Sequence, residues 1–78
     1  MKLVCDNKRF GLVKPECNDN LPSKTMDINY NQCTVQFFVC KTCAKHMAVD
    51  ALKFGHTGTV RSGVDMVAYM TREKEHVG

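Results

Sequence analysis

The sequence predicts a small α+β domain that is held together by one zinc ion. Three observations predict it: the chain has 78 residues, five of them are cysteines, and a strand-like run passes straight into a helical pattern at Cys40-Lys41-Thr42-Cys43. A chain of this length buries only about 60% of the surface that its unfolded form exposes. Domains near this limit often contain a metal ion or disulfides that staple the fold. We expect residues 1–78 to form one such domain.

The first element is expected to be a β-hairpin over residues 2–14. The turn residues at positions 6–8 lie between two short runs of strand-forming residues. Residues 15–32 contain two prolines and six Asn or Asp residues, which is the composition of a loop. Within this loop, apolar alternation over residues 26–30 indicates one short edge strand.

The clearest strand covers residues 33–39, which are rich in β-branched and aromatic side chains. It leads directly into a helix over residues 42–54, where apolar residues recur at helical spacing. Thr42 is the expected N-cap of this helix, and Gly55 is its expected C-terminal stop.

A short strand over residues 59–61 and a second helix over residues 64–75 complete the expected fold. Ser62, followed by Asp65 three residues later, resembles a capping box at the start of this helix. The narrow apolar stripe expected to face the core consists of Val64, Val67, Ala68 and Thr71.

The five cysteines are typical of either a disulfide framework or a metal site. A disulfide framework needs an oxidising compartment, but the N-terminal residues lack the apolar run of a secretory signal. No stretch approaches the eighteen or so apolar residues of a membrane span. The cysteine count is odd, and the chain starts with Met. We therefore expect an intact intracellular chain in the reducing cytoplasm, with its cysteines bound to metal.

Cys40 and Cys43 form the first half of the predicted site. Two thiolates three residues apart at a helix start can point at one ion, and the helix dipole stabilises their charge. This C-x2-C spacing matches half of a tetrahedral Zn²⁺ site.

The other half has several candidates. Cys5 precedes a turn and Cys17 lies in a turn-forming sequence, so these two are the preferred partners. Cys33 shares the face of the residue 33–39 strand opposite to Cys40, which favours a core or strand-edge position over a ligand. His46 lies one helical turn after Cys43 and is an alternative fourth ligand.

A strand that ends in C-x2-C at a helix start resembles the C-terminal half of a treble-clef zinc finger. The resemblance covers residues 33–54, and only Cys40 and Cys43 match its motif. It implies a zinc-stapled module that binds nucleic acid or protein. Some treble clefs are nucleases that use a histidine on the preceding strand, but residues 33–39 contain none. The resemblance therefore favours a non-enzymatic module.

The same segment is also similar to the active site of thioredoxins and glutaredoxins. There, Cys-x-x-Cys starts a helix and its first cysteine is a nucleophilic thiolate. Those folds need further strands and a proline that faces the thiols, whereas only 35 residues follow Cys43 and none is proline. A thiol-disulfide redox protein is therefore the alternative to a zinc module.

Two kinds of partner are consistent with the sequence. Contact with nucleic acid would use Lys41, Lys45, Lys53 and Arg9, although a net charge of +3 is modest and lysines also form ordinary solvated faces. Contact with a larger protein, or a homodimer, would use apolar surface on the second helix at Met66, Tyr69 and Met70. A small adapter or inhibitor of the kind found in viruses and mobile elements would fit this chain. No small-molecule substrate is expected.

Overall fold

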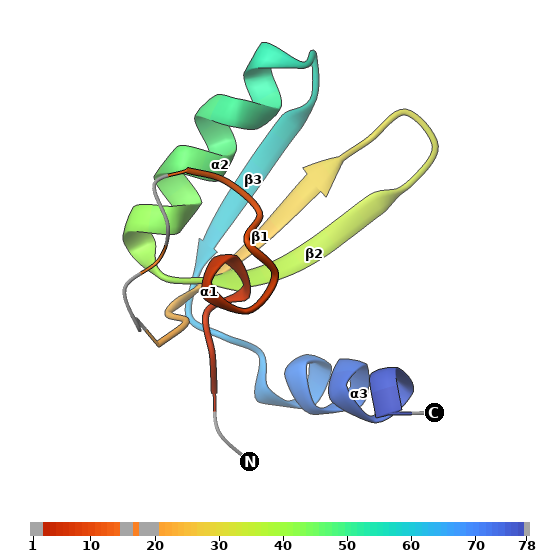
Figure 1. Cartoon of the computed structure of the whole chain (residues 1–78). Coiled ribbons are helices and arrows are strands. Elements are labelled where there is room, and N and C mark those ends of the chain that lie inside the picture. Colours follow the sequence, from red (N-terminus) through yellow and green to blue (C-terminus); the bar gives the residue numbers. More distant parts are fainter. Residues whose placement is uncertain (1–2, 15–16, 18–20, 78) are drawn as a thin grey trace.

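The computed structural model describes residues 3–14, residue 17 and residues 21–77, with side chains as far as Arg72. These residues form an α+β fold with one antiparallel sheet, which confirms the predicted fold class. Figure 1 shows the elements, which in chain order are α1 (Asp6–Phe10), β1 (Lys24–Asn29), β2 (Thr34–Val39), α2 (Lys41–Lys53), β3 (Thr57–Ser62) and α3 (Met66–Val77).

The sheet has the strand order β2-β1-β3, so β1 is its central strand. β1 and β2 form a hairpin whose turn is closed by the N–H of Tyr30, which donates to the carbonyl of Cys33 at 2.8 Å. Met26 of β1 lies opposite Phe37 on one side and Val60 on the other. The expectation that residues 26–30 form an edge strand is therefore wrong, because β3 pairs along the free side of β1.

One face of the sheet carries the core. Met26 and Ile28 point from β1 toward α2, where Ala44, Met47 and Ala51 are buried. This spacing on α2 follows the predicted helical periodicity. α2 passes close over β3 at Gly58, where an added Cβ would lie 4.0 Å from the Cα of Ala48 in α2 and 2.7 Å from the side chain of Met26. Glycine at this position therefore permits the close approach of helix and strand.

The other face of the sheet is largely polar. The carboxylate of Asp27 accepts hydrogen bonds from Gln36 of β2 at 3.3 Å and from Arg61 of β3 at 3.2 Å. One end of this face is covered, where Phe38 packs edge-on against Tyr69 of α3 with ring centroids 5.4 Å apart. α3 therefore covers one end of the sheet on the side away from α2 (Figure 1).

The N-terminal segment forms the short helix α1, and the predicted hairpin over residues 2–14 is wrong in its described part. The carbonyl of Cys5 accepts the N–H of Arg9 at 3.0 Å, which closes the first helical turn. Gly11 ends the helix with a left-handed backbone, φ 61°, and its N–H donates to the carbonyl of Asn7. Asp6 and Asn7, which were expected to form a turn, begin this helix instead, because their side chains form buried hydrogen bonds with Phe38 and Cys43. Residue 2 lies outside the described residues.

Of the three residues expected to cap the ends of the helices, two differ from the structure. The N-cap of α2 is Cys40 instead of Thr42. Gly55 does stop α2, with φ 77°, as predicted. At the start of α3, Asp65 replaces Ser62 as the cap, because its carboxylate accepts the N–H groups of Val67 and Ala68.

The buried side of α3 also differs from the predicted apolar stripe. Val67 is 76% exposed, whereas the side chain of Tyr69 is completely buried. Aromatic packing on Phe38, not aliphatic periodicity, determines which side of α3 faces the sheet. Within the part of the chain that the structure describes, no helix has the length and apolarity needed to cross a membrane.

Candidate metal centre

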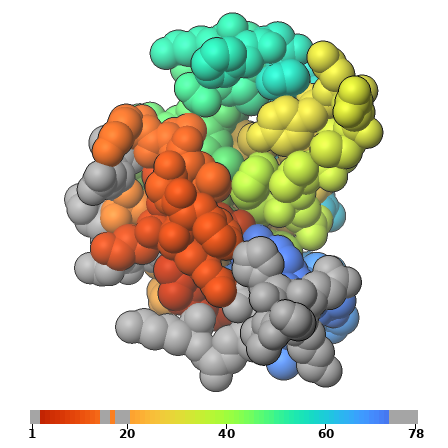
Figure 2. Space-filling view, turned by 45° about the vertical axis from the view of Figure 1, so that its right-hand side comes forward, coloured from red at the N-terminus to blue at the C-terminus, as the bar shows by residue number. Residues whose placement is uncertain are grey.

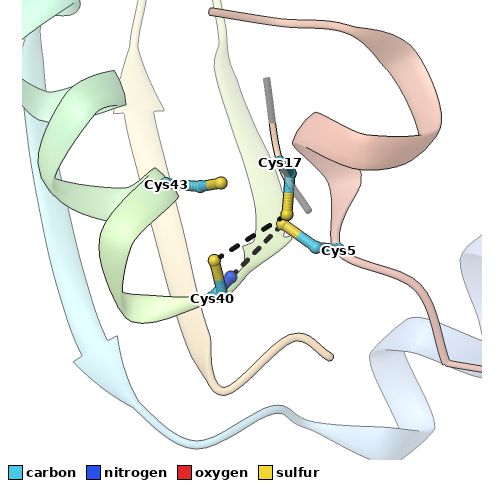
Figure 3. Close-up of side chains that lie close together, drawn as sticks. All are labelled: Cys5, Cys17, Cys40 and Cys43. Carbon is cyan, nitrogen blue, oxygen red and sulfur yellow. Dashed lines mark hydrogen bonds between the residues drawn. The ribbon is translucent and has the colours of Figure 1, made fainter. Parts of the chain in front are cut away.

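Four buried thiols meet at one point between α1, α2 and the end of β2. The Sγ atoms of Cys5, Cys17, Cys40 and Cys43 all lie within 4.8 Å of one another, and the side chains point toward a common centre (Figure 3). The sulfurs of Cys17 and Cys40 are 4.0 Å apart. Four thiolates around a tetrahedral zinc ion lie about 3.8 Å from one another, since the Zn–S distance is about 2.3 Å. The cluster therefore has the dimensions of a tetrathiolate metal site.

Separate parts of the fold supply the four thiols. β2 ends at Val39 and turns directly into α2, which places Cys40 and Cys43 on the first turn of that helix. Cys5 occupies the N-cap of α1, and Cys17 lies in the connection from α1 to β1. All five cysteines of the chain are free thiols. The structure thus brings together the four cysteines that the sequence favoured.

Hydrogen-bond donors surround the sulfur atoms. The backbone N–H of Cys40 donates to Sγ of Cys5 at 3.4 Å, and the side-chain amide of Asn7 donates to Sγ of Cys43 at the same distance. Asn7 is itself held in place, because its Oδ1 accepts the N–H of Val13 at 2.8 Å. Such donors stabilise negative charge on sulfur and orient the ligands of metal sites.

Burial and hydrogen bonding act in opposite directions on the thiols. Burial raises the pKa of the Cys5 thiol above its ordinary value, against the opposing effect of the Cys40 N–H. Burial also raises the pKa of Cys43, and the hydrogen bond from Asn7 offsets this only in part. Burial acts on Cys40 in the same sense, but the N–H of Cys43 and the neighbouring thiols outweigh it, so the pKa of Cys40 is lowered. Four thiolates can coexist here only if a cation compensates their charge.

Comparisons of this chain with protein-family models, with curated proteins and with solved structures gave no match.

The segment that carries Cys5 is anchored to the opposite end of the chain. Asp6 is completely buried, and its carboxylate accepts the N–H of Phe38 at 2.8 Å and two hydrogen bonds from the guanidinium of Arg72. The hydroxyl of Tyr69 accepts the N–H of Val4 at 3.2 Å. Figure 2 shows this segment, in red and orange, on the left of the visible face, and part of α3, in blue, at the lower right. α3 therefore holds both chain neighbours of Cys5, Val4 and Asp6, and so fixes the position of Cys5.

The alternative metal ligands lie apart from the thiol cluster. Cys33 is exposed in the turn just before β2, which is an edge strand of the sheet. Of the two positions expected for it, core or strand edge, the core position is therefore wrong. His46 is half-buried on α2, and the clustered ligand atoms do not include its nitrogens among the described residues.

The predicted partner-binding residues are mostly exposed. Lys41, Lys45 and Lys53 are exposed on α2, and Arg9 is exposed on α1 with its guanidinium over the ring of Phe10. Contact with nucleic acid stays a prediction.

On α3, Met66 and Met70 are each about half-exposed, at 45% and 46%. Tyr69 is completely buried beneath the guanidinium of Arg72 and against Phe38, so its expected place on an exposed interface is wrong.

Asp6, Asn7 and Arg72 support the site, yet sequence reasoning missed all three. Asp6 and Asn7 have turn-forming side chains, and Arg72 lies in a run of charged residues. No local pattern distinguishes these residues from solvated ones. Their positions depend on contacts between segments that are 32 to 66 residues apart in the chain, such as that of Asp6 with Arg72.

Proposed function

We propose that Cys5, Cys17, Cys40 and Cys43 bind one zinc ion and that the chain is a non-catalytic binding module. The observation that carries this proposal is the single buried cluster of four sulfur atoms within 4.8 Å of one another. Soft thiolate ligands in tetrahedral geometry favour zinc among the common divalent ions. The hydrogen bonds from Cys40 N–H and from Asn7 support thiolates at this point.

The proposed zinc ion would be structural. Four protein ligands leave no open position for water, so the ion has no route to Lewis-acid catalysis. Free energies of zinc binding to such sites are on the order of 10–16 kcal/mol. This binding free energy is large compared with the free energy of unfolding of a domain of this size. The zinc ion would hold α1 and the start of α2 together.

The order of the ligands supports a treble-clef-like arrangement. Cys5 and Cys17 come before the β1–β2 hairpin, and Cys40 and Cys43 come after it on the first turn of a helix. The resemblance seen in residues 33–54 thus extends to the first ligand pair, although eleven residues separate Cys5 from Cys17 in place of a compact turn.

A redox function of Cys40 and Cys43 is less well supported. A lowered pKa of Cys40 is what an attacking thiol needs. Attack also needs access, and Cys40 and Cys43 are only 6% and 3% exposed. Two further thiols occupy the same cluster, which a dithiol site does not require.

Mass spectrometry separates these two functions. The intact mass of the purified protein under native conditions should exceed the denatured mass by one zinc atom, and elemental analysis should identify zinc. The variants Cys5→Ser, Cys17→Ser, Cys40→Ser and Cys43→Ser should each lose zinc, whereas Cys33→Ser should keep it. Equal native and denatured masses, with loss of two hydrogen atoms upon oxidation, would instead establish a redox dithiol.

A closed metal site favours a binding role over a catalytic one, and we propose a larger protein as the partner. Exposed apolar side chains on α2 and α3 support this choice, among them Leu52, Met66 and Val67.

A further inference from the structure

A surface pocket of about 280 Å³ lies between α2 and β3, and none of the clustered cysteines lines it. α2 and β3 lie side by side in Figure 1. The residues that line the pocket are three lysines and three small apolar residues: Lys24, Lys41, Ala44, Lys45, Ala48 and Val60.

The fold explains why these residues meet. Lys41, Ala44, Lys45 and Ala48 are spaced by three and four residues, so they lie along one face of α2. Val60 faces α2 from β3, because it is paired with Met26, whose side chain is buried under that helix. The pocket thus has a floor of alanine and valine side chains, and the side chains of three lysines form its rim.

The positive charge at the rim is not neutralised within the described residues. The ion pairs that the structure describes involve Arg61 and Arg72, on the other side of the sheet. Lys24 donates to a neutral hydroxyl, that of Ser62, at 3.2 Å. Three unneutralised ammonium groups around an apolar surface are complementary to a ligand that combines carboxylates with an apolar side chain.

The lining favours a peptide over nucleic acid. None of the six lining residues is aromatic, so the pocket offers no ring on which a base could stack. The apolar surface also continues along α2, where Val49 and Leu52 are 56% and 66% exposed. Phosphate contacts would leave this apolar surface unused.

The conformation of the ligand follows from β3. This strand is at the edge of the sheet and all six of its residues are exposed. Edge strands bind extended peptides through their backbone groups. A strand paired with β3 would direct alternate side chains toward α2 and the pocket.

We propose that the groove between α2 and β3 binds an extended acidic segment of a partner protein, with one aliphatic side chain in the pocket and carboxylates on Lys24, Lys41 and Lys45. The proposal goes beyond the zinc site, and it specifies the partner class of the binding module. Its test uses zinc-loaded protein of verified metal content, so that loss of zinc and loss of peptide binding are measured separately.

Fluorescence anisotropy with labelled peptides provides the test. The probe is acetylated Asp-Glu-Leu-Asp-Glu, and the matched peptide has serine in place of leucine. We expect the leucine peptide to bind several-fold more tightly and to weaken as salt rises, because rim charges are screened. In amide NMR spectra, the shifted signals should come from residues 41–48 and from β3.

Charge reversal at the rim gives the decisive comparison. Lys45→Glu and Lys41→Glu should each weaken binding by about fivefold or more, since each turns an attraction into a repulsion. Lys53→Glu makes the same charge change on the same helix but outside the pocket, and should have less than a twofold effect. Val60→Asp tests the apolar floor and should abolish the preference for leucine over serine.

Three results would overturn the proposal. One is the absence of binding by the leucine peptide while zinc and the folded NMR spectrum are retained. Another is an equal effect of Lys45→Glu and Lys53→Glu, which would indicate unspecific charge attraction. The third is tighter, Lys45-dependent binding of a short DNA duplex, which would assign the groove to nucleic acid.

Discussion

The carboxylate of Asp6 accepts two hydrogen bonds from the guanidinium of Arg72, at 2.7 and 2.9 Å, although these residues are 66 positions apart in the chain. Asp6 directly follows Cys5 in the chain. The guanidinium of Arg72 also stacks over the ring of Phe38, 4.9 Å from its centroid. The Asp6–Arg72 pair therefore joins the proposed metal centre to the last helix.

Arg72→Ala should strongly destabilise the protein. Asp6 is fully buried, and removal of its partner leaves an unpaired carboxylate, which costs about 3 kcal/mol or more in the free energy of unfolding. Urea unfolding of the zinc-saturated protein measures this change.

Arg61→Ala is the matched control for that experiment. Arg61 also pairs with an aspartate, Asp27, but its side chain is 57% exposed. Exposed pairs contribute about 0–1 kcal/mol. Equal destabilisation by the two variants would contradict the structural role of the Asp6–Arg72 pair.

Thiol titration should report the occupancy of the metal site. Cys33 is exposed, whereas the other four cysteines are buried in the cluster. With zinc bound, Ellman's reagent should react rapidly with one thiol per chain. After addition of a strong chelator and denaturant, all five should react, and Cys33→Ser should remove the rapid phase alone. Rapid reaction of a second thiol in the zinc-loaded protein would argue against a closed tetrathiolate site.

Asn7→Asp should weaken zinc binding. The substitution keeps the acceptor for the N–H of Val13 but replaces the donor to Sγ of Cys43 by a carboxylate. Loss of an outer-shell partner of this kind reduces metal affinity by about 10- to 100-fold. Competition with a fluorescent zinc chelator measures the affinity. Asn29→Asp, on the polar face of the sheet, is the control and should leave the affinity unchanged.

The stability of the metal-free and the zinc-loaded protein should depend on pH with opposite signs. In the metal-free protein, burial raises the pKa values of Cys5 and Cys43 above the ordinary value of 9.0. The unfolded chain then loses these protons first, so stability is present below about pH 9 and falls as the pH rises further. The lowered pKa of Cys40 opposes this effect in part.

In the zinc-loaded protein, protons compete with the metal for the thiolates, so stability should fall as the pH decreases. Urea unfolding between pH 5 and 10, with zinc or with chelator, gives both curves. If the two curves run parallel, the thiol cluster does not bind the metal.

The strand-to-helix junction at Cys40 could be predicted because its signals are local. Strand propensity up to Val39, helical periodicity after Lys41 and the stop at Gly55 all lie within residues 34–55. The C-x2-C spacing then indicated the thiol pair without knowledge of the rest of the fold.

The N-terminal segment could not be predicted for the opposite reason. Asp6 and Asn7 have strong turn preferences, but their buried hydrogen bonds to Arg72, Phe38 and Cys43 outweigh those preferences. Likewise, β1 was expected at an edge, because a single sequence does not reveal that β3 pairs with it. Contacts between distant segments overrode local propensity in both cases.

The distance between Asp6 and Arg72 along the chain also has a consequence during synthesis. At about 5–20 residues per second, the ribosome adds Arg72 roughly 3–13 seconds after Asp6. The hairpin and α2 are synthesised within that interval, while the carboxylate that must be buried beside Phe38 still has no guanidinium. All four clustered cysteines, by contrast, have been made by residue 43. A metal ion captured at that stage would hold the nascent N-terminal segment against α2 until α3 emerges and secures it.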